Sequence, residues 1–284
     1  MARDALLIVV ASALFGVVVW LLALPAGRRR LHSRDSEPRG WWRLVFPLLA
    51  GAFVVAFLVG WAFQEPNPAD ERAGIGLHLL AVATIGIVIR ALIRSVMALR
   101  SSSRAHTPIG TVGLLAPRVI VSDEFRRLAS GDVLRAALAH EAAHAVGRDP
   151  LRLWLAQLAA DLQWPIPGTG RRLSAWILAL EAERDDEAVA SGASPEDLAE
   201  AILIAARLHS GPAARLCANA IGSGEGIAWR VRRLLALEAP VRRNALRRSF
   251  WFVGTSCSAL VLAAVWLGVR YGEAVLGVLP GMGR

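Results

Sequence analysis

The chain has 284 residues, with 32 lysines and arginines against 23 aspartates and glutamates, and a formal net charge of +9. Its two cysteines lie on separate segments, so a disulfide-stapled secreted scaffold is excluded. No basic stretch carries interleaved aromatic residues, so we expect no direct nucleic-acid partner. Hydrophobic residues make up 55% of the chain and are gathered into long runs, which indicates a membrane protein.

Four apolar runs predict transmembrane helices over residues 5–26, 44–63, 74–93 and 252–269. Runs of about 20 residues, at about 1.5 Å per residue, match a hydrocarbon core of about 30 Å. A cleaved signal peptide is an alternative for the first run, although its apolar stretch is long and three arginines follow almost at once. Arg90 and Arg94, at the end of the third run, are expected to reach lipid head groups.

The charges of the connections orient these predicted helices. Residues 27–43 carry six arginines, whereas residues 64–72 carry three acidic residues and one arginine. Because arginines and lysines gather on the cytoplasmic side, the first connection is expected inside and the N-terminus outside. We therefore predict a multi-pass protein of the inner (plasma) membrane, with the lipid bilayer as a partner and the C-terminus outside.

The predicted spans divide the chain into residues 1–97 with three helices, a cytosolic domain at 98–248, and a last helix with a short tail at 249–284. Residues 107–122 are rich in β-branched residues and turn formers, which predicts a hairpin or two short strands. The rest of the domain is predicted to be helical, so the fold class is a mainly α membrane protein with a cytosolic α+β domain. The strand edge at 110–113 or 119–121 would bind an extended substrate, or the strands would only cover the neighbouring helix.

The sequence His-Glu-x-x-His stands at His140, Glu141 and His144. Ser130 before this stretch and Gly147 after it are typical of the two ends of a helix. Residues four apart share a helix face, so both imidazoles can bind one Zn²⁺ while the adjacent glutamate accepts a proton from water. The alternative is that the two histidines are satisfied core or interface residues without a metal.

A third ligand is expected in the acidic stretch 181–187 of a later helix. Catalytic zinc takes three protein ligands and leaves a position open, so a carboxylate would complete the set, and Glu181 is the candidate. Asp185 lies one turn on and would hold a ligating histidine through the other ring nitrogen. The alternative is a charged helix face without a metal. For the oxyanion of the intermediate, the candidate donors are His209 and Arg184.

Residues 221–226, Ile-Gly-Ser-Gly-Glu-Gly, follow no predicted strand and precede no Gly-Lys-Ser/Thr. They are therefore interpreted as a linker, and no nucleotide is expected as a ligand.

Several stretches resemble the BlaR/MecR-type membrane metallopeptidases. They are residues 113–121, residues 138–144 with Asp149, Glu181 with Asp185 and Asp186, Gly192 with residues 194–199, and residues 229–235. The resemblance implies a gluzincin fold with one catalytic zinc, the ligands His140, His144 and Glu181, and Glu141 as the general base. We also expect Asp149 to lie behind the ligands.

The best-known members of that family sense β-lactams outside the cell and cleave themselves and a transcriptional repressor inside. Only residues 272–284 follow the last predicted span, so we expect no penicillin-binding sensor domain. The sequence thus predicts a membrane-anchored zinc endopeptidase acting on a protein such as a repressor in signal transduction. The alternatives are an HtpX- or CAAX-protease-like enzyme of quality control or processing, and a non-catalytic membrane signalling scaffold.

Overall fold

The computed structural model describes residues 75–102, 107–164, 168–208, 224–236 and 262–271, together with Trp41, Leu44 and Ala56. The chain forms two compact units, one of residues 1–31, 42–90 and 245–284 and one of residues 32–41 and 91–244. The predicted span at 5–26 lies outside the described residues, and so does the span at 44–63 except for Leu44 and Ala56. Residues 252–261 of the last predicted span also lie outside them. In the first unit, the structure describes residues 75–90 of α3 (Ile75–Ser102) and a helical segment at 262–271.

The prediction of an integral membrane protein is wrong. Of the helices that the structure describes, none is both long and apolar enough to cross a membrane. This finding contradicts both the four-span fold class and the multi-pass location in the plasma membrane. Residues 75–93 of the predicted third span lie in α3, and Gly74 lies outside the described residues. Directly after the predicted span, Nε of Arg94 binds Asp161 Oδ1 at 2.7 Å. That arginine, expected at lipid head groups, instead forms an ion pair with a protein carboxylate.

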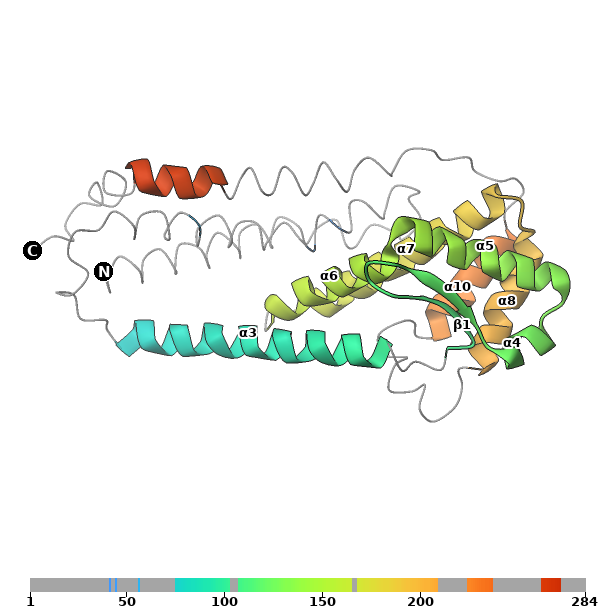
Figure 1. Ribbon diagram of the computed structural model, residues 1–284, viewed down its shortest axis with the longest axis horizontal. Helices are drawn as coiled ribbons and strands as arrows, with labels where there is room; N and C mark the ends of the chain where they lie inside the picture. The colour runs from blue at the N-terminus through green and yellow to red at the C-terminus, as the bar shows by residue number, and fades with distance from the viewer. Residues whose placement is uncertain are drawn as a thin grey trace, which may run out of the picture. The chain divides into compact units, whose positions relative to one another are not determined.

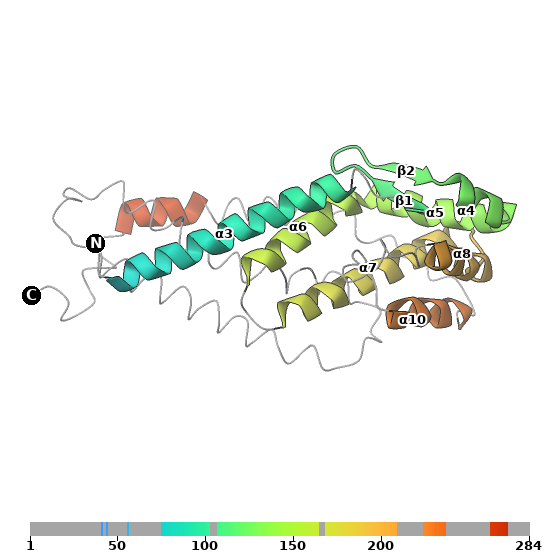
Figure 2. The same cartoon turned by 90° about the horizontal axis from the view of Figure 1, so that it is seen from below.

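The predicted hairpin is present in the second unit. Strand β1 (Ile109–Val112) pairs antiparallel with β2 (Arg118–Val121), with Thr111 opposite Val119. The turn needs Gly113, whose φ is +96° and where a Cβ would lie 2.6 Å from the Ala116 carbonyl oxygen. In Figure 2 the hairpin runs along α5, which it also contacts, so β1 lies next to the helix that carries the histidines.

Besides residues 91–102 of α3, the described part of this unit contains six further helices. They are α4 (Asp123–Leu128), α5 (Gly131–Gly147), α6 (Asp149–Leu162), α7 (Thr169–Ala190), α8 (Pro195–Leu208) and α10 (Gly224–Leu235). Helix α5 is central, because it contacts α6, α7, α8 and both strands (Figure 1). Ser130 caps its N-terminus by accepting a hydrogen bond from the Val133 N–H at 3.3 Å.

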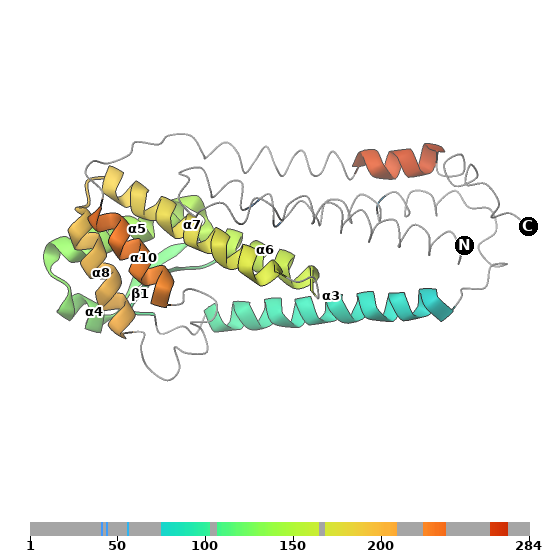
Figure 3. The same cartoon turned by 180° about the vertical axis from the view of Figure 1, so that it is seen from behind.

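Two hydrophobic clusters fix α5 from different sides. In one, Val133 and Ala137 pack with Phe125 and Ile204, and Ile109 and Val121 of the hairpin cover them. In the other, Ala136 packs with small and branched residues of α7, α8 and α10, namely Ala188, Val189, Leu198, Ala199 and Leu234. Full burial of a side chain such as Phe125 or Leu234 contributes roughly 1.5–3 kcal/mol. Helix α10 lies beside α8 and α7 (Figure 3), so the second cluster ties three helices to α5.

The junction between α5 and α6 consists of a single residue. Arg148 is the C-cap of α5 and the N-cap of α6, with φ 51° and ψ 40°. Among the described residues it is the sole non-glycine with a positive φ. Such a conformation is costly without a glycine and is often found next to functional groups. Here it ends α5 and begins α6 within one residue, and Oδ2 of Asp149, the first residue of α6, lies 2.9 Å from Nδ1 of His144.

Candidate metal centre

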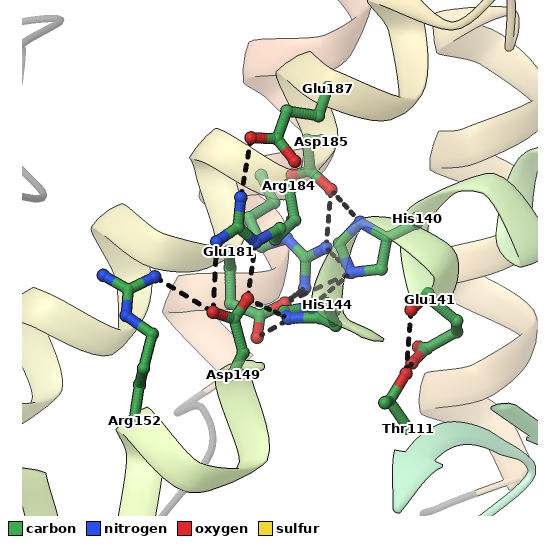
Figure 4. Close-up of polar contacts among 11 residues, drawn as sticks. Thr111, His140, Glu141, His144, Asp149, Arg152, Glu181, Arg184, Asp185 and Glu187 are labelled. Atoms are coloured by element: carbon green, nitrogen blue, oxygen red, sulfur yellow. Dashed lines mark hydrogen bonds and ion pairs between the residues drawn. The ribbon is translucent and has the colours of Figure 1, made fainter. Parts of the chain in front are cut away.

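Three donor side chains converge between α5 and α7. Nε2 of His140 lies 3.0 Å from Nε2 of His144, one helical turn further on. The Glu181 carboxylate approaches both rings, with Oε2 at 3.5 Å from the first Nε2 and Oε1 at 3.7 Å from the second. These donor atoms all lie within 4.8 Å of one another, so the group could hold a metal ion (Figure 4).

His144 is held from behind by a buried carboxylate. Its Nδ1 lies 2.9 Å from Oδ2 of Asp149, whose side chain is completely buried. Arg184 binds both oxygens of that carboxylate, through Nε at 2.5 Å and Nη2 at 3.0 Å, and Arg152 adds a third contact at 3.0 Å. The buried aspartate therefore orients the imidazole so that its Nε2 faces the other donors.

His140 is held in a similar way by different elements. Its Nδ1 lies 3.0 Å from Oδ1 of the fully buried Asp185, although the two atoms are not aligned as a hydrogen bond. Arg230 of α10 donates to both oxygens of Asp185, from Nη2 at 2.7 Å and from Nε at 3.0 Å. Its Nη1 also lies 2.8 Å from Glu181 Oε2. One guanidinium therefore contacts both the candidate ligand Glu181 and the carboxylate that lies behind His140.

This arrangement of charges favours a cation between the donors. Burial would lower the pKa of His144, but the Glu181 and Asp149 carboxylates outweigh it and raise this pKa from 6.5 to about 10. The pKa of His140 is also raised, because Asp185 and Glu181 outweigh its burial. Burial would raise the pKa of Glu181, but the positive charges of Arg230 and His144 hold it well below its usual value.

The donor set itself fits a metal such as zinc. Each Nδ1 lies within 3.0 Å of a carboxylate, and the two Nε2 atoms lie 3.0 Å from each other and 3.5–3.7 Å from the Glu181 oxygens. Without a proton or a metal ion between them, the Nε2 lone pairs and the carboxylate would repel one another. Two histidines and one carboxylate are also the protein ligands of a well-known type of catalytic zinc site.

Glu141, which the sequence predicts as a general base, is tied to the hairpin. The Thr111 hydroxyl on β1 lies 2.7 Å from Oε2 of Glu141 and 2.9 Å from its backbone carbonyl oxygen. Glu141 is half-buried, follows His140 on α5 and points to the hairpin side of that helix (Figure 4). The threonine thus fixes the carboxylate next to the strand edge.

The two predicted oxyanion donors are placed differently from the candidate metal ligands. Arg184 is 5% exposed, and its guanidinium binds Asp149 and, through Nη1 at 2.7 Å, Glu187. Its hydrogen-bonding groups therefore serve the support of His144. His209 lies outside the described residues.

Sequence reasoning missed Arg230, which is 90 positions from His140. The available signal was the run Trp-Arg-Val-Arg-Arg-Leu-Leu at 229–235, in which Arg230 and the apolar Leu234 are four residues apart and share a helix face. That spacing indicates that this arginine lies on the packed side of the helix.

The fold and site define a helical protein with a small hairpin and a candidate centre of two histidines and one carboxylate for a metal ion. No protein family, curated protein or solved structure was found to be similar to this chain. The resemblance to BlaR/MecR-type metallopeptidases therefore stays a prediction.

Proposed function

We propose that this protein is a zinc-dependent peptidase. The observation that carries the proposal is the convergence of His140, His144 and Glu181, each imidazole held from behind by a buried aspartate. A purely structural zinc site takes four protein ligands, whereas three leave a position for water and substrate. Among the described residues, the only His, Cys, Asp or Glu group with metal-binding geometry contains these three.

Zinc bound by this set would supply a Lewis acid that polarises a peptide carbonyl and makes water acidic. Glu141 would accept the proton of the attacking water as its oxygen bonds to the carbonyl carbon. The same carboxyl group would then give the proton to the amide nitrogen as the carbon–nitrogen bond breaks and the amine leaves. The Thr111 hydroxyl, 2.7 Å from Glu141 Oε2, would keep the base in one orientation between these two transfers.

The hairpin supports a peptide as the substrate class. Its sheet has two strands in the described part of the chain, so the outer edges of β1 and β2 pair with no further described strand. Thr111, in the middle of β1, contacts the proposed base directly. An extended peptide added to this edge would gain backbone hydrogen bonds and pass close to Glu141.

The test compares the full chain with Glu141→Gln, with His144→Ala and with Glu200→Gln, a matched change at an exposed glutamate of α8. Quenched-fluorescence peptide mixtures report cleavage, and elemental analysis reports bound zinc. We expect Glu141→Gln to keep zinc and lose at least about 10²-fold in rate, His144→Ala to lose both, and Glu200→Gln to keep both. Undiminished cleavage by zinc-loaded Glu141→Gln would contradict the proposal.

A further inference from the structure

Arg230 places a partly buried guanidinium at the edge of the candidate metal centre. Its side chain is 13% exposed and contacts Asp185 through two nitrogens and Glu181 through the third. Nη2 also lies 3.5 Å from Nε2 of His140. One residue thus reaches two of the three donor side chains, one directly and one through the aspartate behind it.

These contacts occupy all three nitrogens of the guanidinium. Nε and Nη2 form a two-pronged contact with Asp185, a geometry that fixes the carboxylate in a plane. Nη1 binds Oε2 of Glu181. The other carboxylate oxygen, Oε1, lies 3.7 Å from Nε2 of His144 and does not take part in this ion pair. Because its donors are directed at carboxylates, Arg230 is suited to position ligands and not to bind substrate.

The core holds this arginine in place. Leu234, four residues further along α10, is completely buried in the cluster with Ala136, Ala188 and Leu198. Arg233 forms a second ion pair between α10 and α7, with Asp186, the neighbour of Asp185. It makes no contact with His140, His144 or Glu181 in the part of the chain that the structure describes, and so offers a matched comparison for Arg230.

We propose that Arg230 is a positioning residue that makes Glu181 bind the metal through a single oxygen and orients His140 through Asp185. The proposal rests on the metal binding assumed for the proposed peptidase, but it concerns the metal site alone. By engaging Oε2, the guanidinium keeps Glu181 from using both oxygens, and this preserves an open position. Without it, Glu181 is free to bind through both oxygens and His140 loses the support behind its ring.

The experiment measures metal binding without any substrate. The full chain is stripped of metal, and its affinity for Zn²⁺ is measured by competition with a chromogenic chelator. Co²⁺ is then bound in place of zinc, because its visible absorption is intense at four-coordinate sites and weak at higher coordination numbers. The variants are Arg230→Gln, Arg230→Lys and Arg233→Gln.

We expect Arg230→Gln to lower zinc affinity by about 10–100-fold and to weaken the Co²⁺ absorption. Arg230→Lys keeps the charge but cannot bind Asp185 with two prongs, so it should recover part of the affinity but not the native spectrum. Arg233→Gln should leave both readouts unchanged.

Native affinity and a native Co²⁺ spectrum in folded Arg230→Gln would overturn the proposal. If that variant does not fold, Arg230→Lys decides in the same way, since a native spectrum in it would also overturn the proposal. Equal losses in Arg233→Gln would show that α10 docking alone matters, which overturns it too. If the unsubstituted chain binds neither ion, the proposed function itself is refuted. This outcome differs from failure of the inference about Arg230, in which the unsubstituted chain binds both ions.

Discussion

The two histidines of α5 are supported by similar groups that the chain assembles in different ways. Behind His144 stand Asp149, five residues away, and the guanidinium of Arg184. Behind His140 stand Asp185 of α7 and Arg230 of α10, which are 45 positions apart. We call these groups the His144 support and the His140 support. The first has an aspartate local to its histidine, whereas the second depends on the packing of α10.

The environments of the two supports differ as well. Arg184 lies deeper than Arg230, with side chains 6% and 13% exposed, and Asp149 also receives a contact from Arg152. Arg230, by contrast, divides its contacts between Asp185 and the donor Glu181. We infer that the His144 support contributes mainly to folding stability, whereas the His140 support contributes mainly to the metal geometry.

The largest expected effect is on the metal-free protein as pH rises, because this change acts on both supports at once. The folded-state pKa of His144 is raised to about 10 from 6.5, through the Glu181 and Asp149 charges that outweigh burial. A raised pKa contributes stability that is complete below pH 6.5 and is lost as pH rises through about 10. Urea unfolding of the chelator-treated protein from pH 6 to 10 should show this loss.

Zinc provides the control for that titration. A bound metal ion would replace the proton between the two Nε2 atoms, and His144 and His140 would become neutral ligands. Zinc binding should therefore release protons and remove the loss of stability at high pH. A metal-free protein whose unfolding free energy is constant or rises between pH 6.5 and 10 would contradict the account of charges at the site.

Asp149→Asn should have the next largest effect. It removes the charge that Arg184 and Arg152 both contact, and breaking a buried ion pair of this kind costs about 3–5 kcal/mol. The matched change is Asp185→Asn, for which we expect a smaller loss because Arg230 keeps its contact with Glu181. Urea unfolding of the metal-free variants measures both values, and equal losses would remove the distinction between the two supports.

Gly147→Ala should disturb the His144 support without removing any charged group. A Cβ at this position would lie 2.5 Å from Nη2 of Arg184 and 2.9 Å from Oδ1 of Asp149. The arginine is held in a buried pair, so its displacement should cost about 1–3 kcal/mol of unfolding free energy. Gly170→Ala on α7, where a Cβ would meet nothing within 4 Å, is the control. No difference between the two alanine variants in thermal unfolding would argue against a tightly fixed Arg184.

Local parts of this structure could be predicted from the sequence. The spacing of His140 and His144 places them on one helix face, and Ser130 before them supplies the cap that the structure contains. The turn residues around Gly113 predict the hairpin because few other residues adopt its φ of +96°. These features depend on neighbours within a few positions.

Features that depend on distant residues could not be predicted in the same way. Hydropathy assigns residues 74–93 to a membrane, because it counts apolar residues and does not register that Arg94 pairs with Asp161, 67 positions away (161 − 94). Similarly, the acidic stretch shows several carboxylates, but which of them faces the histidines depends on how α7 packs on α5. Arg230 reaches the site only because Leu234 is buried against those helices.

The smallest expected effect is the coupling between substitutions in zinc affinity. Arg230 and Asp185 belong to one support, so Arg230→Gln combined with Asp185→Asn should lose less affinity than the sum of the single losses, by at least about 0.5 kcal/mol. Arg230 and Asp149 belong to different supports and share no described contact, so their combined losses should add to within about 0.5 kcal/mol. Chelator competition on the three single variants, the two double variants and the unsubstituted chain measures both interaction energies. If the two energies are equal, the supports act as one network, and the separate role assigned to the His140 support would have to be abandoned.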